Sequence, residues 1–163
     1  MKRHSVLILV ALVLSGIAAC KKDKTYVYDV NDTTIKQNSS SKKNVKTTTE
    51  FVSIAFADLF STNINNAELN KLSTAYDGFG DKKLIERLII KNYLNNPSAK
   101  VPSKAVMKAD VGKFVKDTYK KFYARDPNDF ELWTIKNIIT SDTSITPTHV
   151  YYSIMTSNEY RYY

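Results

Sequence analysis

The sequence predicts an all-α domain of about six helices behind a signal peptide and a flexible tether. Three observations favour helices. Apolar residues recur at helical spacing through residues 50–163, capping residues and prolines bound these runs, and the whole chain contains only four glycines. No stretch of this region alternates apolar and polar residues with the period of two that a half-buried strand requires. We therefore expect packed helices and not a β-sandwich.

The first 19 residues have the pattern of a lipoprotein signal peptide. Lys2 and Arg3 form a short basic region, and residues 6–19 carry no charge. This run is shorter than the ~20 residues that span a bilayer core, and its length suits the apolar region of a signal peptide. Residues 17–20, Ile-Ala-Ala-Cys, resemble the lipobox recognised by the lipoprotein signal peptidase. The alternative is an ordinary secretory signal followed by an incidental cysteine.

Cys20 is the only cysteine, and the lipobox resemblance implies that it becomes the lipid-anchored first residue of the mature protein. An exported protein with one cysteine cannot form an internal disulfide, and its free thiol would be exposed to oxidation. Lipid on the sulfur and an acyl group on the new amine would remove that thiol and attach the chain durably to a bilayer. Lys21 resembles the residues that permit release to the bacterial outer membrane, although the sequence leaves open which side the domain faces.

Residues 20–49 are predicted to be a flexible, basic tether. They are rich in Lys, Asn, Ser and Thr and contain few apolar residues. Loss of the signal peptide leaves 22 basic against 16 acidic side chains, a net charge of +6, of which +4 lies in the tether. Nucleic acid is not expected as a partner of an exported protein. Anionic headgroups or envelope polysaccharide suit this charge better.

The domain at residues 50–163 is predicted to contain two helical units, at about 50–97 and 108–163. Pro97 and Pro102 bracket a loop between them. The first unit has apolar helical patterns at the following residues: 50–60, 67–76 after a capping asparagine at 65 or 66, and 84–94 after Gly80-Asp81.

The second unit begins with the clearest helical pattern in the chain. Apolar residues and one threonine recur at i, i+3, i+4, i+7 and i+8 from Val111 to Phe122, and lysines fill the opposite face. Asp126-Pro127 predicts a capping residue and a first-turn proline before a helix at 128–140. Thr146-Pro147 predicts the same arrangement before residues 150–155.

The two units look like copies of each other. An offset of 63 positions (114 − 51) needs no gap and aligns these residues: Phe51-Val52 with Phe114-Val115, Asn65 with Asn128, and Glu68-Leu69 with Glu131-Leu132. An offset of 65 aligns Ile85 with Val150 further along. The alternative is that any two pairs of amphipathic helices align this well. If the duplication is real, each unit is too small to bury its apolar face alone, and the two must pack together.

About 50 residues of the second unit carry a motif: Phe114-Val115, Tyr119, Phe122, Arg125, Pro127, Glu131, Trp133 and the closing segment 156–160. This motif resembles a helical module of exported bacterial proteins that is related to the phycobilisome linker domain. The chain departs from the module in having Ala124 where a glycine usually precedes the arginine, and Asp126 where Glu or Ser is frequent. The resemblance implies a scaffolding or attachment role, with no catalytic residues to carry over.

We expect no catalytic site, no metal site and no cofactor. His4 leaves with the signal peptide and His149 stands alone, whereas a zinc site or a nucleophile-base pair needs several such residues. Glu131 and Glu159 are available as a glycosidase pair. Because Arg125 and these two glutamates are the polar members of an otherwise apolar motif, we instead expect structural ion pairs among them.

Tyrosine is unusually frequent, with 11 residues, and the chain ends on Tyr160-Arg161-Tyr162-Tyr163. Tyr and Arg are enriched at interfaces, so Arg161, Tyr162 and Tyr163 are the expected partner-binding residues. The alternative is that Tyr151 and Tyr160 face the core and the last residues fray.

The expected function is that of a non-enzymatic adaptor or scaffold subunit of an envelope protein complex. The alternative is a ligand-binding accessory that holds a glycan or peptide through Tyr and Trp surfaces. A flat, exposed aromatic patch would favour the adaptor, and a concave pocket lined by aromatic residues would favour the accessory.

Overall fold

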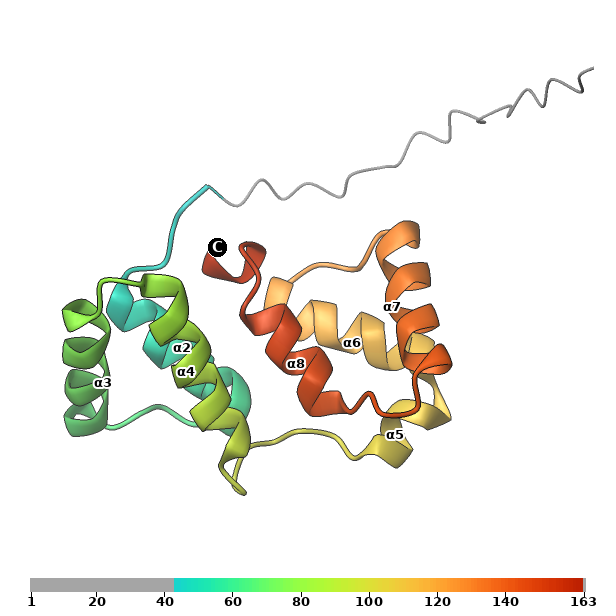
Figure 1. Cartoon of the computed structure of the whole chain (residues 1–163), viewed down its shortest axis with the longest axis horizontal. Coiled ribbons are helices and arrows are strands. Elements are labelled where there is room, and N and C mark those ends of the chain that lie inside the picture. The colour runs from blue at the N-terminus through green and yellow to red at the C-terminus, as the bar shows by residue number, and fades with distance from the viewer. Residues whose placement is uncertain (1–42, 163) are drawn as a thin grey trace, which may run out of the picture. The chain divides into compact units, whose positions relative to one another are not determined.

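The structure, a computed structural model, describes residues 43–162 (Figure 1). Within this range the chain forms seven α-helices and one short 3-10 helix, and no strand. The predicted all-α fold is therefore confirmed. The predicted signal peptide, the lipid-attachment residue Cys20 and most of the tether lie outside the described residues, as does Tyr163.

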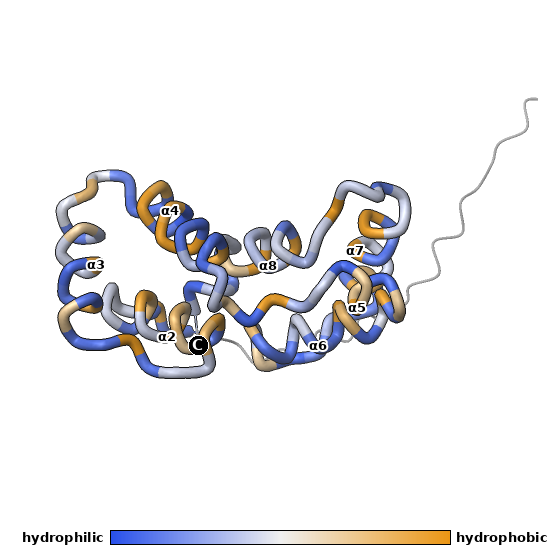
Figure 2. Tube along the Cα trace, turned by 90° about the horizontal axis from the view of Figure 1, so that it is seen from below, coloured by the Kyte–Doolittle hydropathy of each residue, from blue (hydrophilic) through white to orange (hydrophobic). Residues whose placement is uncertain are grey.

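The first unit contains α2 (Thr48–Phe60), α3 (Asn66–Gly78) and α4 (Lys82–Asn95), all of which pack against one another. Each helix begins after a residue whose side chain accepts a hydrogen bond from a backbone N–H of the first turn: Thr47, Asn65 and Asp81. At Thr47 the bond is reciprocal, because the side chain of Glu50 accepts from the Thr47 backbone. In Figure 2 hydrophobic and hydrophilic residues alternate along α4, as an amphipathic helix requires.

The second unit contains α6 (Val111–Tyr123), α7 (Asp129–Ser141), α8 (Pro147–Met155) and the 3-10 helix η2 (Glu159–Arg161). The apolar face predicted for α6 is buried as expected. The Thr146-Pro147 prediction is also confirmed, because Thr146 caps α8 and Pro147 is its first residue.

The start predicted for α7 is wrong. Asp126 is not the cap, and Pro127 lies outside the helix. Asn128 caps α7 instead, because its side chain accepts from the backbone N–H of Glu131 while Glu131 accepts from the backbone N–H of Asn128. This reciprocal pair satisfies two backbone donors, whereas Asp126 lies 3.3 Å from Lys120 as an ion pair.

One helix was not predicted. The six-residue α5 (Lys104–Ala109) follows Pro102, and Ser103 caps it. The Pro-Ser pair before it is a helix-start signal, but the helix is too short to show an apolar period.

Helices of the two units begin and end at corresponding positions in the sequence. Both α2 and α6 have 13 residues, and each ends at a non-glycine residue with a left-handed backbone, Ser61 (φ 56°) and Ala124 (φ 54°), 63 positions apart. The caps of α3 and α7, Asn65 and Asn128, are also 63 positions apart. The positive φ of Ala124 is a backbone conformation that glycine adopts more readily than alanine. The duplication itself stays a prediction.

The two units share one apolar core. Helix α4 of the first unit contacts α8 of the second. At the centre lies the side chain of Tyr160, which is fully buried between the rings of Phe51, 6.1 Å away, and Phe122, 6.0 Å away. Because Phe51 belongs to α2 and Phe122 to α6, this one residue joins the two units.

The boundary predicted between tether and domain, at residue 50, is wrong by several residues. Val45 forms an isolated antiparallel bridge with Tyr162, and the backbone N–H of Lys46 donates to the carbonyl of Arg161 at 2.9 Å. Lys46 was counted as a tether charge, but it is 5% exposed. Its Nζ donates to the carbonyl of Tyr160 at 2.5 Å and lies 3.8 Å from the centroid of the Tyr160 ring. The backbone carbonyl and the aromatic ring of Tyr160 therefore both stabilise the buried Lys46 cation.

Candidate functional site

Arg125 lies directly after the left-handed end of α6, where the chain turns towards α7. Its guanidinium makes two hydrogen bonds to each predicted partner, at 2.7 and 2.8 Å to Glu131 and at 2.6 and 2.7 Å to Glu159. A fifth bond goes to the carbonyl of Asp126, so all five N–H donors are used. The predicted ion pairs are therefore both present, and they fasten α6 to the start of α7 and to η2.

This cluster has the properties of a structural clamp. The hydrogen bonds from Arg125 lower the pKa of Glu131, which also accepts from the backbone of Asn128. A glycosidase would need a carboxylic acid with a raised pKa. The geometry therefore favours the structural interpretation of Glu131 and Glu159.

The C-terminal segment makes contacts inside the fold that the sequence analysis did not predict. Arg161 was expected to bind a partner, but its Nε lies 3.1 Å from Glu86 and its Nη2 donates to the hydroxyl of Tyr76 at 3.0 Å within the fold. The guanidinium also packs over the ring of Phe51. The first unit supplies a carboxylate for Arg161 that the local sequence cannot reveal, and the role of Arg161 in partner binding stays a prediction.

Two further tyrosines complete this segment. The side chain of Tyr162 is 37% exposed, although its backbone pairs with Val45. Tyr163 lies outside the described residues. Of the three residues expected to bind a partner, Tyr162 is the one whose described side chain is open to solvent.

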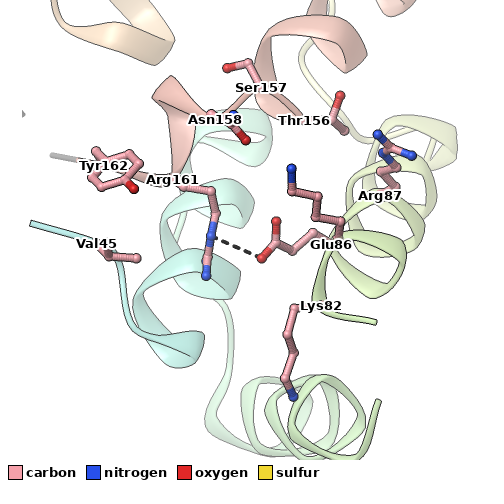
Figure 3. Close-up of a pocket in the computed structure, with 10 residues that line it drawn as sticks. Val45, Lys82, Glu86, Arg87, Thr156, Ser157, Asn158, Arg161 and Tyr162 are labelled. Atoms are coloured by element: carbon pink, nitrogen blue, oxygen red, sulfur yellow. Dashed lines mark ion pairs between the residues drawn. The ribbon is translucent and has the colours of Figure 1, made fainter. Parts of the chain in front are cut away.

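A cationic pocket of about 350 Å³ lies between α4 and the C-terminal segment (Figure 3). Helix α4 contributes Lys82, Lys83, Glu86 and Arg87, and the C-terminal segment contributes residues 156–158, Arg161 and Tyr162. Val45 completes the rim. Sequence reasoning missed this pocket because its two walls lie far apart in the chain.

Two of the four basic residues of the cationic pocket interact with acceptors in the described part of the fold, and the other two have no acidic partner there. Arg161 pairs with Glu86, and Nζ of Lys82 donates to the carbonyls of Tyr76 and Asp77. Within residues 43–162, Lys83 and Arg87 have no acidic partner. Four cations and one carboxylate leave the pocket with a formal excess of +3.

A second surface feature is an aromatic pair on α7. Phe130 is 66% exposed and Trp133 is 62% exposed, and their ring centroids lie 6.5 Å apart in a stacked arrangement. Trp133 belongs to the motif that resembles the helical module, and its side chain lies at the surface and not in the core. Helix α7 packs on α6 and leaves this face uncovered. The half-exposed Ile138 extends the apolar character of α7.

His149, which was not expected to belong to a catalytic or metal site, takes part in a helix cap. His149 is exposed, and its Nδ1 accepts from the backbone N–H of Thr146 at 3.3 Å as part of the cap of α8. The described part of the chain contains no group of three or more His, Cys, Asp or Glu residues placed to hold a metal ion. None of the helices in that part is both long and apolar enough to cross a bilayer.

No protein-family model, curated protein or solved structure matches this chain.

Proposed function

We propose that this protein is a non-enzymatic lipoprotein, attached to the bacterial outer membrane through Cys20, that serves as an adaptor in an envelope protein complex. The observation that carries the adaptor role is the aromatic pair Phe130 and Trp133. Large aromatic side chains that are mostly exposed and adjacent on one helix face are typical of protein interfaces, where they supply much of the binding energy.

The alternative role, a glycan- or peptide-binding accessory, depends on tyrosine and tryptophan surfaces. Most described tyrosines are instead in the core: Tyr76, Tyr93, Tyr119, Tyr123, Tyr151 and Tyr160. Burial raises the pKa of Tyr76 to about 12, which fits a phenol shared with Glu86 and Arg161 inside the fold. The exposed aromatic surface that is left on α7 lies on a helix face, and this favours docking of a protein.

We expect the double substitution Phe130→Ala and Trp133→Ala to abolish capture of the partner. The assay is cross-linking of the lipoprotein in intact cells followed by identification of the captured proteins. Each interface aromatic is worth about 2 kcal/mol, or roughly thirtyfold in affinity, when it acts as a central contact. The melting temperature should hardly change, since both side chains are mostly exposed.

Val106→Ala is the matched control. Val106 is 61% exposed on α5, so its truncation also removes an exposed apolar side chain. The adaptor proposal requires that this variant retain every captured protein. An unchanged set of proteins in the double variant would contradict the proposal, and loss of glycan binding in that variant would support the accessory role instead.

The membrane attachment is tested separately. Cys20→Ala should abolish incorporation of labelled lipid and move the protein from the membrane fraction to the soluble fraction, because no other residue can carry the thioether. Cys20→Ser is a conservative variant that should behave in the same way. Persistent membrane attachment of both variants would show that Cys20 is not the anchor.

A further inference from the structure

The cationic pocket takes no part in the adaptor proposal. Its charge is concentrated on one side, where Lys83 and Arg87 follow each other on the first two turns of α4. The one carboxylate in the pocket, Glu86, forms an ion pair with Arg161 and accepts a hydrogen bond from the hydroxyl of Tyr76, so it is already engaged. The excess positive charge thus has no counter-charge in the pocket wall.

Hydrogen-bond donors accompany this charge. The side chain of Asn158 lines the pocket and has no hydrogen-bond partner within residues 43–162, and Figure 3 shows it on the turn opposite Glu86 and Arg87. The side chains of Asn158, Lys83 and Arg87 are therefore open to solvent as donors on the pocket wall, and such a set suits an oxyanion.

Charge and size distinguish between kinds of oxyanion. A carboxylate carries one negative charge, whereas a phosphate monoester carries about 1.5 to 2 at neutral pH and presents three acceptor oxygens. A formal excess of +3 matches the phosphate better. The volume of about 350 Å³ equals that of roughly ten water molecules, enough for a phosphate and part of the group attached to it.

We propose that the cationic pocket binds a phosphate monoester, with Lys83 and Arg87 as the direct contacts and Asn158 as an additional donor. Two sources supply this chemistry, a soluble phosphate monoester and a lipid whose headgroup is a phosphate monoester, such as phosphatidic acid. The second source rests on the proposed attachment at Cys20. Val45, on the pocket rim, is separated from Cys20 by 25 residues, and 25 residues of polypeptide can extend over at most about 80–90 Å. A headgroup is thus within reach of the pocket.

The first experiment measures binding of inorganic phosphate to the full-length chain carrying Cys20→Ala, by calorimetric titration at pH 7.5. We expect saturable binding that weakens as salt is added. The double substitution Lys83→Ala and Arg87→Ala should weaken binding at least tenfold. Lys91→Ala, an exposed lysine of α4 outside this pocket, is the charge-matched control and should bind phosphate like the parent. Absence of saturable binding, equal loss in Lys91→Ala, or equally tight binding of acetate would overturn the proposal.

The second experiment separates the two sources. Vesicles of phosphatidylcholine with and without phosphatidic acid are sedimented with the same proteins. Co-sedimentation that needs phosphatidic acid and is lost in the Lys83/Arg87 variant assigns the site to a headgroup. Phosphate binding in solution without vesicle binding assigns it to a soluble phosphate compound. The Phe130/Trp133 variant should bind phosphate normally, so failure of the adaptor proposal and failure of this one are distinguishable.

Discussion

Tyr160→Ala should destabilise the domain more than any other single truncation considered for this chain, by about 3–5 kcal/mol. The side chain is completely buried, so its removal leaves a cavity between α2 and α6 that neither helix can fill. It also removes the ring that stabilises the buried Lys46 cation. Thermal and urea unfolding followed by circular dichroism would measure the change.

Tyr160→Phe is the matched control, because it keeps the ring and removes only the hydroxyl. That hydroxyl donates to Asp58 at 2.7 Å, and its loss should reduce stability by about 1–2 kcal/mol. Burial raises the pKa of Asp58, while the Tyr160 hydroxyl and Lys46 oppose this rise. The hydroxyl stabilises the charged carboxylate, so the difference between wild type and Tyr160→Phe should be largest at neutral pH and shrink as Asp58 is protonated in acid. Equal stability of the Ala and Phe variants would show that the ring does not join the two units.

Local patterns predicted most of this fold because helix formation depends on neighbours in the sequence. The apolar period of α6 and the caps Asn65, Asp81 and Thr146 each depend on residues within about two turns. The six-residue α5 was missed because it is shorter than the window in which a period is visible.

The errors and omissions in the sequence interpretation share one cause, which is contact between distant residues. Lys46 was assigned to the tether, but it is buried against Tyr160, 114 positions away. Arg161 was assigned to a partner surface, and its hydrogen bond to the hydroxyl of Tyr76, 85 positions away, was missed. Trp133 has the helical spacing of a core residue, yet no other element covers its side of α7. A single sequence does not specify which element will cover a given helix face.

Site prediction succeeded where the polar residues belong to one motif and failed where they do not. Arg125 and Glu131 are six positions apart, and their isolation among apolar residues marked them as partners. The cationic pocket combines the start of α4 with the end of the chain, and neither segment alone contains the site. Its charge becomes visible only when the fold brings Arg87 and Asn158 to the same cavity.

Arg125→Ala should destabilise the domain by about 2–4 kcal/mol, corresponding to a fall of roughly 10 °C in melting temperature. The substitution leaves Glu131 and Glu159 close together without their shared counter-charge. Because the Arg125 side chain is only 16% exposed, water cannot fully replace its five hydrogen bonds. Lys113→Ala removes an exposed ion pair with Asp117 on α6 and should melt like wild type, since solvent screens that pair.

The pH dependence gives this prediction a second readout. Hydrogen bonds from Arg125 lower the pKa of Glu131 in the folded protein below its value of about 4.3 in the unfolded chain. The ion pair therefore contributes its full stability at pH values above about 4.3. This contribution is lost as the pH falls through the lower pKa of Glu131 in the folded protein. The difference between wild type and Arg125→Ala should therefore be constant from about pH 5.5 to 7.5 and should shrink in acid. Arg125→Lys should restore less than half of the lost stability, because an ammonium group cannot make paired hydrogen bonds to two carboxylates. Wild-type melting of Arg125→Ala at neutral pH would mean that the clamp does not hold α6, α7 and η2 together.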